Sequence, residues 1–393
     1  MKITGVRTQP YEITLRRPIG DANSPAGFDR MPMLAVWVDS DEGPSGVSFG
    51  TPAVRGQIHA LVQDLLVGRD PRGVRGHWKR MMDAVFKGGN RGAANAAVSA
   101  IDVALWDLKA KLHDEPLWKT LGASTRKVRA YASGIDLNLD DESLRRFYED
   151  MAARGVHAGK LKVGLDHESD LRRIAIMRDA LATSGKPPVL MVDANEYWSP
   201  KQAIRHISAY EEQFDLFWVE EPARRWDVRG LREVSRAVRA AVATGENLDD
   251  ISEFRPLIAG GAVDVVEVGS KTGGITGALL VADLAYGFDL PVSLMNCPAH
   301  FMAHLAAALP NHVMMECAML GRSDGVIAHH VIEDGWITLT DRPGLGIEFD
   351  SARLQALAVE APGGAARAGS WGRRRGAGLL EVGPGEAEEP GEE

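Results

Sequence analysis

The chain has 393 residues and is mildly acidic, with 45 lysine and arginine residues against 54 aspartate and glutamate residues and a formal net charge of −9. A chain of this length can bury one large α/β domain or two domains, and an acidic chain without a basic stripe argues against a nucleic-acid partner. No apolar run approaches a signal peptide or the roughly 20 residues of a membrane span, and two cysteines, Cys297 and Cys317, are too few for a disulfide scaffold, so we expect a cytoplasmic protein.

The first part of the chain is predicted to form an α+β domain. Residues 3–13 and 33–50 alternate apolar and polar side chains like the strands of a hairpin. Between them, PIGDANSPAGFDRMP (18–32) is rich in glycine, proline and aspartate and has no periodicity, so we expect a functional loop such as a lid. In residues 93–114, large apolar residues recur at spacings of four, three and four, which predicts a long helix with one apolar face.

From about Val128 onward, short apolar runs alternate with amphipathic stretches in about eight units. Regular strand–helix alternation predicts a parallel sheet with right-handed crossovers, and eight units predict closure into a barrel. No G-x-G-x-x-G follows the first of these strands, which argues against an open, doubly wound sheet. The predicted fold class is therefore α/β, a modified (β/α)8-type TIM barrel preceded by an α+β domain.

The predicted domain organisation has four segments. These are an N-terminal α+β domain (1–125), the barrel (126–340), a C-terminal segment that returns to the first domain (341–362) and a tail (363–393). The tail is rich in glycine, alanine, arginine and glutamate, with little that could form a core, so we expect it to be flexible. A charged interaction arm is the alternative for this tail.

Three successive predicted strands end in carboxylates, in the sequences VDAN, WVEEP and TGEN. In a barrel the chemistry lies at the carboxyl ends of the strands, so Asp193, Glu220 and Glu246 are expected to converge at one rim. Converging carboxylates repel one another unless a cation joins them, and oxygen ligands favour Mg²⁺. No histidine or cysteine lies at these ends, which argues against zinc. The alternative is that the acids cap the helices that follow.

The sequence KLK places Lys160 and Lys162 on the same face of the preceding strand. Near another cation and away from water, the pKa of a lysine is expected to fall toward that of a usable base. We therefore predict that Lys162 removes a proton from the carbon next to a metal-bound carboxylate and that Lys160 tunes it. The alternative is that the strand ends here and both lysines reach water.

The motifs KLKVG, VDANEYW, WVEEP, TGENL and SKTGGITGA, in this order, resemble those of the enolase superfamily and, within it, the mandelate racemase group. The resemblance extends from the N-terminus to about Asp350 and excludes the tail. It implies an enolase-like barrel whose mouth is covered by the N-terminal domain, with residues 18–30 contacting the far end of the substrate. It also implies Mg²⁺ bound by three ligands, a lysine base and a homo-oligomer. The residues that match are Asp193, Glu220 and Glu246 for the metal, and Lys162 and Lys160 for the base and its neighbour.

The sequence departs from the group's pattern at the second base, which is usually a His–Asp dyad. The aspartate position falls on Val268 and the histidine position on Asn296, so both partners are absent. His300, four residues later, could reach the pocket, or it could be a core or capping histidine. Glu316 matches the acid that hydrogen-bonds the substrate carboxylate. Three further residues are predicted to bind the substrate, namely Asn195, Asn296 and Lys271.

These observations predict a Mg²⁺-dependent lyase that acts on a small carboxylate substrate, most simply an acid-sugar dehydratase. Racemisation needs a base on each face of the substrate, whereas loss of a β-hydroxyl needs one base and an acid, a role that Lys162 itself could fill. The alternatives are a racemase, epimerase or cycloisomerase that uses His300 or another group, and a barrel that binds a carboxylate without turning it over. A Schiff-base role for Lys162 would leave the three carboxylates unexplained.

Overall fold

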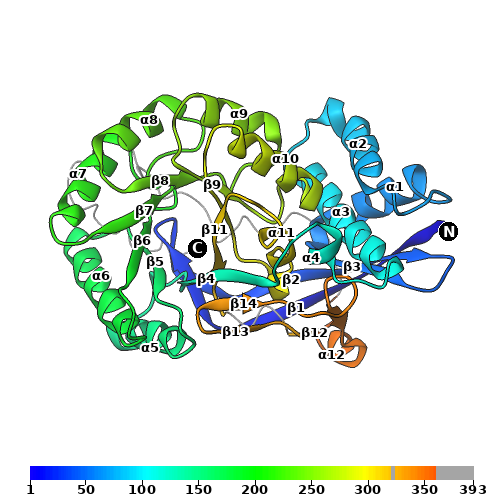
Figure 1. The fold of residues 1–393 in the computed structure, drawn as a ribbon, viewed down its shortest axis with the longest axis horizontal. Coiled ribbons are helices and arrows are strands. Elements are labelled where there is room, and N and C mark those ends of the chain that lie inside the picture. Colours follow the sequence, from blue (N-terminus) through cyan, green and yellow to red (C-terminus); the bar gives the residue numbers. More distant parts are fainter. Residues whose placement is uncertain (320–323, 360–393) are drawn as a thin grey trace, which may run out of the picture.

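The computed structural model describes residues 1–319 and 324–359, which form a closed barrel and an α+β domain beside it (Figure 1). The predicted barrel fold is confirmed, because eight parallel strands pair in sequence order and the last pairs with the first. The barrel strands are β4 (Lys127–Ser133), β5 (Ala158–Lys162), β6 (Val189–Asp193), β7 (Leu216–Glu220), β8 (Ala241–Thr244), β9 (Val265–Val268), β10 (Val292–Leu294) and β11 (His312–Cys317).

The helices between these strands surround the barrel on its outside (Figure 1). They are α5 (Asp141–Ala152), α6 (His167–Ala182), α7 (Pro200–Glu211), α8 (Val228–Ala237), α9 (Ile251–Ala259), α10 (Gly274–Tyr286) and α11 (Ala303–Ala306). Five of them begin at a side chain that accepts a hydrogen bond from the first turn: Asp140, Asp166, Ser199, Asp227 and Asp250. Helix capping in this barrel is therefore done by residues other than the three strand-end acids.

The barrel interior is filled by side chains that come from most of its strands. Tyr131, Met191 and Trp218 are fully buried there, and the rings of Tyr131 and Trp218 meet edge to face with centroids 5.3 Å apart. This layer closes the barrel below the carboxyl ends of the strands. Polar groups at those ends therefore stand on an apolar floor.

The N-terminal domain consists of three antiparallel strands packed against helices. Its elements are β1 (Ile3–Asp21), β2 (Ser24–Ser40), β3 (Ser45–Gly50), α1 (Arg55–Leu65), α2 (Val74–Val85), α3 (Ala93–Leu112) and α4 (Leu117–Thr120). The long helix expected over residues 93–114 is α3, and it packs against β3 and α10. This helix therefore joins the N-terminal domain to the barrel.

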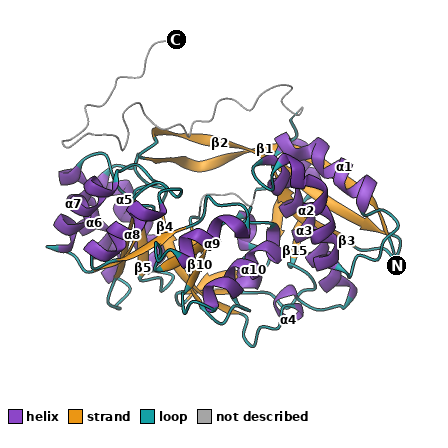
Figure 2. Ribbon diagram, turned by 90° about the horizontal axis from the view of Figure 1, so that it is seen from above, coloured by secondary structure: helices purple, strands orange, loops and turns teal. Residues whose placement is uncertain are grey.

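The loop predicted over residues 18–32 is wrong, because β1 and β2 continue through it as a hairpin that lies across one end of the barrel (Figure 2). Ile19 pairs with Phe28, and Asp21 pairs with Ser24 across the tip. The register shifts between Thr14 and Ile19 and again before Asp21, and Pro18 and Pro25 fall in stretches without a ladder partner. These irregularities hide the two-residue alternation that would have identified the strands.

After β11 the described chain returns to the N-terminal domain. Its elements are β12 (Val326–Ala328), β13 (Val331–Glu333), β14 (Trp336–Thr338), β15 (Ile347–Phe349) and α12 (Ser351–Ala356). β14 pairs with β4, and the backbone of Glu12 in β1 donates to Leu357 at 3.0 Å. The predicted tail, 363–393, lies outside the described residues. Across the described ranges no helix is long and apolar enough to cross a membrane.

Candidate active site

A cavity of about 570 Å³ lies at the carboxyl ends of the barrel strands, beneath the tip of the β1–β2 hairpin. Six of the ten residues predicted for the site line it: Lys162, Asn195, Glu246, Lys271, Asn296 and Glu316. Three others, Lys160, Asp193 and Glu220, lie behind this surface and are linked to it by ion pairs. Nine of the ten predicted residues therefore belong to one connected group.

Lys162, Asp193 and Glu220 end three adjacent strands at the same register. Neighbouring strands lie about 4.8 Å apart, so side chains that point the same way at one register level are in contact. The Lys162 Nζ lies 2.5 Å from Asp193 Oδ2. A hydrogen bond also holds the backbone at the end of β5, where Asp136 Oδ1 accepts from the backbone N–H of Lys162 at 3.0 Å.

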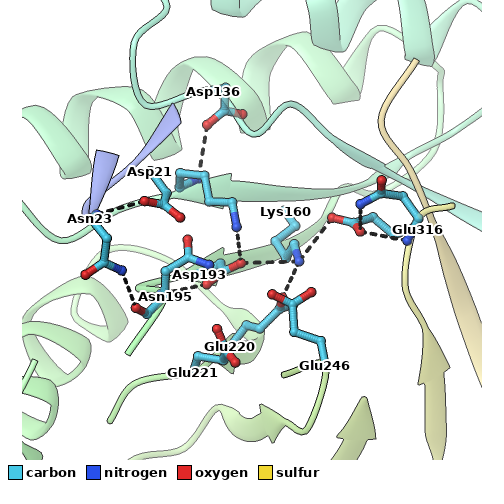
Figure 3. Close-up of polar contacts among 12 residues, drawn as sticks. Asp21, Asn23, Asp136, Lys160, Asp193, Asn195, Glu220, Glu221, Glu246 and Glu316 are labelled. Atoms are coloured by element: carbon cyan, nitrogen blue, oxygen red, sulfur yellow. Dashed lines mark hydrogen bonds and ion pairs between the residues drawn. The ribbon is translucent and has the colours of Figure 1, made fainter. Parts of the chain in front are cut away.

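Lys160 stands two residues earlier on the same face and is 1% exposed. Its ammonium group lies among three carboxylates, in contact with Glu220, 3.2 Å from Glu316 Oε1 and 3.3 Å from Asp193 Oδ2 (Figure 3). The two lysines therefore do not reach water at the end of the strand, as one reading of the sequence allowed. They are the cationic part of a buried ionic cluster.

Carboxylates outnumber ammonium groups in this cluster. Asp193, Glu220, Glu246 and Glu316 face Lys160 and Lys162, and Glu267 on β9 is a fifth buried carboxylate that interacts with Glu220, so negative groups are in excess. Burial and the charge of Asp193 raise the pKa of Glu220 well above its usual value, and burial also raises the pKa of Glu246. A divalent cation would offset this excess of carboxylates.

The donor set fits a hard cation such as Mg²⁺. All the candidate ligands are carboxylates, and Glu220 Oε2 is buried without a hydrogen-bond partner. Within residues 1–319 and 324–359, no three His, Cys, Asp or Glu side chains already stand in a metal-binding arrangement. In this structure the ammonium group of Lys160 lies among the carboxylates of Asp193, Glu220 and Glu316.

The expected fall in the pKa of Lys162 is wrong for this arrangement. Burial and the ammonium of Lys160 lower this pKa, but the attraction of Asp193, Glu246 and Glu220 outweighs them and raises it above its ordinary value. For Lys160, burial again lowers the pKa, and its three carboxylate neighbours again reverse the direction. Counting only the neighbouring lysine in the sequence omitted the larger effect of the acids on β6 and β7.

The side of the cavity formed by β9 and β10 carries fewer ionisable groups. Val268 is buried, and Asn296 donates from its backbone N–H to Glu316 Oε2 at 2.9 Å and also contacts it through its side chain. Lys271 lines the rim and is exposed, while its backbone oxygen accepts from Ser99 Oγ at 2.8 Å. Neither half of a His–Asp dyad stands here.

Unlike the other nine predicted site residues, His300 neither lines the cavity nor belongs to the ion pairs behind its surface. It lies in a short 3-10 turn (Pro298–His300) after β10, with a φ of 47°, and its Nδ1 is 3.2 Å from Nε2 of His330. The reading of His300 as a packing residue fits this position better than the reading as a second base.

Several lining residues were not predicted. Asp21, Asn23, Phe28 and Met31 come from the hairpin, and Ile135, Glu221, Arg225, Trp226 and Met295 come from the barrel loops and strand ends. The hairpin was expected to contact substrate, but the loop prediction gave no basis for choosing its inward side chains. Glu221 had a signal in the doubled glutamate of WVEEP; it is 1% exposed and accepts from Asn247 Nδ2 at 2.8 Å.

Comparison with protein families matches most of the chain. Residues 5–122 match the model of the mandelate racemase / muconate lactonizing enzyme N-terminal domain, and residues 143–353 match the enolase C-terminal domain-like model. A 3,6-anhydro-α-L-galactonate cycloisomerase of Streptomyces coelicolor is 32% identical, over 91% of this chain and 99% of its own. An L-talarate/galactarate dehydratase of Salmonella typhimurium is 32% identical, over 88% of each chain.

Solved structures of similar proteins contain magnesium. A racemase from Streptomyces coelicolor A3(2) with bound magnesium superposes with a TM-score of 0.84 at 32% identity, covering 91% of this chain and all of its own. The Salmonella typhimurium dehydratase, liganded with Mg and L-lyxarohydroxamate, superposes with a TM-score of 0.82 at 29% identity, covering 91% and 93%.

Proposed function

Because the chain belongs to the mandelate racemase / muconate lactonizing enzyme group of the enolase superfamily, we propose that it is a Mg²⁺-dependent acid-sugar dehydratase. It removes the proton α to a carboxylate and expels a β-hydroxyl as water. The relatives include dehydratases of galactarate, arabinonate and galactonate type, which are lyases of this kind.

The observation that carries the proposal is the ionic wall of the cavity. A lysine, an aspartate and a glutamate stand side by side at one register level, with a second lysine behind them and a third acid beside them. Structural ion pairs alone do not require an excess of carboxylates in the wall of an open cavity, because buried uncompensated charge is costly. A cation and a carboxylate substrate account for both the excess and the opening.

We assign Asp193, Glu220 and Glu246 as the metal ligands. These three residues would hold Mg²⁺, which would supply Lewis acidity to the substrate carboxylate, and the engagement of Asp193 would favour the neutral amine of Lys162. Lys160 holds Asp193, Glu220 and Glu316 at fixed positions through its three contacts. Glu316, held by Asn296, faces the cavity where it can orient the substrate carboxylate.

Lys162 is the assigned base. Its amine takes the α-proton, and the electron pair of the broken C–H bond moves into the carboxylate to give an enediolate. The electrons then form a double bond between the α and β carbons as the β-hydroxyl leaves with a proton as water. The resulting enol becomes a 2-keto-3-deoxy acid. Racemisation is disfavoured because Val268 and Asn296 place no base on the opposite side.

A cycloisomerase is the second candidate, favoured by one observation. The cycloisomerase of Streptomyces coelicolor matches nearly its full length at the same identity as the dehydratase. It would use the same removal of an α-proton by Lys162, and a ring oxygen would leave in place of a hydroxyl.

The test is a screen of aldonic, aldaric and anhydro-aldonic acids with Mg²⁺ in deuterium oxide. A dehydratase yields a 2-keto-3-deoxy acid from an open-chain acid, whereas a cycloisomerase acts only on the ring compound. Chelation of the metal should abolish either reaction. If no acid is consumed and none gains deuterium at the α carbon, the catalytic proposal is wrong and the barrel only binds carboxylates.

From the family resemblance we also propose that the enzyme is a homo-oligomer. Its proposed substrate is a small carboxylate, the kind of molecule that is bound in a similar structure complexed with Mg and L-glucarate. Light scattering of the purified protein would measure the number of subunits, and a mass equal to one chain would exclude the oligomer.

A further inference from the structure

The tip of the β1–β2 hairpin is attached to the barrel on both sides of the Lys162 strand. On the β4 side, the Gly20 backbone N–H donates to Ile135 O at 3.0 Å, and Leu137 N–H donates to Gly20 O at 3.2 Å. On the β6 side, Asn23 Nδ2 donates to Asn195 O at 2.7 Å (Figure 3). Since β5 lies between β4 and β6, these bonds hold the tip over the end of β5.

The turn itself touches the segment that follows Lys162. Ala22 is fully buried, and a Cβ built on Gly164 would lie 3.4 Å from the Cβ of Ala22. Gly164 also has a φ of 127°, a conformation that favours glycine. The hairpin tip therefore has a fixed position, and its side chains enter the cavity at a defined place.

Asp21, at the end of β1, points into this cavity and is only 4% exposed. Its Oδ1 accepts from the backbone N–H groups of Asn23 at 2.8 Å and Ser24 at 3.0 Å, which close the turn. In the described part of the chain its Oδ2 has no hydrogen-bond partner. One oxygen thus serves the turn and the other faces the cavity.

The neighbourhood of Asp21 favours the protonated form of its carboxyl group more than water does. Burial raises its pKa, which the Lys162 charge opposes and the Asp193 charge reinforces. The β9–β10 side offers no alternative acid, because Val268 and Asn296 stand at the dyad positions, Lys271 is an exposed cation at the rim and His300 does not line the cavity. The other lining acids have partners or another assigned role: Glu316 is held by Lys160 and Asn296, Glu196 pairs with Arg225, Glu221 accepts from Asn247, and Glu246 is assigned to the metal.

We propose that Asp21, delivered by the hairpin, is the catalytic acid that protonates the leaving β-oxygen. The inference rests on the proposed β-elimination. Lys162 takes the α-proton, the C–O bond breaks with its electron pair going to oxygen, and that oxygen takes the proton of Asp21 Oδ2 and leaves as water. Lys162 gains one proton and Asp21 loses one, and ketonisation and solvent restore both. The function of the missing dyad is thus divided between the barrel and the N-terminal domain.

A purely structural role for Asp21 makes a different prediction. The amide oxygen of Asn accepts the same two backbone N–H groups, so Asp21→Asn keeps the turn and removes only the transferable proton. The matched control is Asp29→Asn on the same hairpin, because Asp29 is exposed and does not line the cavity. A structural role predicts that Asp21→Asn behaves like this control.

The experiment uses the acid sugar identified by the screen and its 3-deoxy-3-fluoro analogue, since fluoride is a weak base that leaves without a proton. For Asp21→Asn, we expect water loss to fall about 10²–10⁴-fold, while α-proton exchange and fluoride release change less than about threefold. If Asp21→Asn loses water at the wild-type rate, or if all three measurements fall equally, Asp21 is not the catalytic acid, and the proposed function still stands. If the wild-type enzyme eliminates neither water nor fluoride from any acid, the proposed function falls and Asp21 with it.

Discussion

The two sides of the cavity are built from different chemistry. The side formed by β5 to β8 carries Lys160, Lys162, Asp193, Glu220 and Glu246, joined by ion pairs or facing the cavity. The side formed by β9 and β10 presents a buried valine, an asparagine and an exposed lysine at corresponding strand ends. Both sides stand on the same apolar floor and have the same backbone architecture.

This difference teaches that the barrel fixes where functional groups stand and leaves their identity free. Removal of a proton from one face needs one base, and the β5–β8 side contains it in the proposed mechanism. Transfer of a proton between faces needs a second base on the β9–β10 side, where none of the expected residues occurs. The asymmetry therefore favours elimination over racemisation.

Removing the Lys162 amine from the β5–β8 side gives the largest expected effect. Lys162→Ala should reduce turnover and α-proton exchange by about 10²–10⁴-fold or more, since a positioned base is lost. Mg²⁺ binding should persist, because none of the three assigned metal ligands is changed. Deuterium incorporation measured by NMR and Mg²⁺ titration by calorimetry check the two parts separately.

Lys271→Ala is the matched variant on the opposite side, because Lys271 also lines the cavity. It should raise KM and leave α-proton exchange of the bound substrate in place. If Lys271→Ala abolished exchange while Lys162→Ala retained it, the base would lie on the β9–β10 side and the comparison would be reversed.

The residues of the β5–β8 side can be predicted from the sequence because the signal for each lies within a few neighbouring residues. Each acid follows an apolar strand directly, and parallel strands bring their carboxyl ends to one rim, so Asp193, Glu220 and Glu246 could be placed together without coordinates. The direction of the Lys162 pKa could not be obtained in this way. It depends on which groups lie nearest in space, and Asp193 contributes more than the lysine two residues away.

The hairpin was mispredicted for a related reason. Asp21 reaches the cavity because Gly20 and Asn23 hydrogen-bond to loops more than 100 residues away in sequence. The turn residues and prolines of this segment are equally typical of an open loop. Nothing local in the segment specifies that its backbone pairs or which side chains point inward.

Histidines near β10 are expected to act in packing, so lowering the pH should reduce the stability of the fold. His304 is fully buried, accepts from the Trp118 backbone N–H at 3.2 Å and contacts Leu345 O at 3.1 Å through Nε2, so it ties α11 to α4 and to the C-terminal segment. Burial lowers its pKa to about 3. The unfolded chain takes up the proton near pH 6.5, so this stabilisation is present above that pH and is lost as pH falls toward 3.

The free energy of unfolding should therefore fall by up to about 1.4 kcal/mol per pH unit for each such histidine below pH 6.5. Denaturant titrations of the wild type and His304→Gln at pH 7 and pH 5 check the contribution of this residue. Between pH 7 and pH 5, the difference in the free energy of unfolding between the two proteins should become smaller by about 2 kcal/mol. His113→Gln, at an exposed position, is the control and should keep the wild-type slope. A constant difference between wild type and His304→Gln would contradict the assignment.

The smallest effect is expected from His300→Asn, and its size decides whether the β9–β10 side takes part in proton transfer. His300 contacts His330 and is not among the residues lining the cavity, so turnover and exchange should change less than about threefold, far from the 10²–10⁴-fold cost of losing an acid or base. His330→Asn disturbs the same contact from the other side and should give a similar small change. Turnover of both α-epimers of the substrate is the informative measurement. If His300→Asn lost reaction from one epimer while still exchanging the other, and His330→Asn did not, His300 would be a second base and the enzyme would catalyse epimerisation.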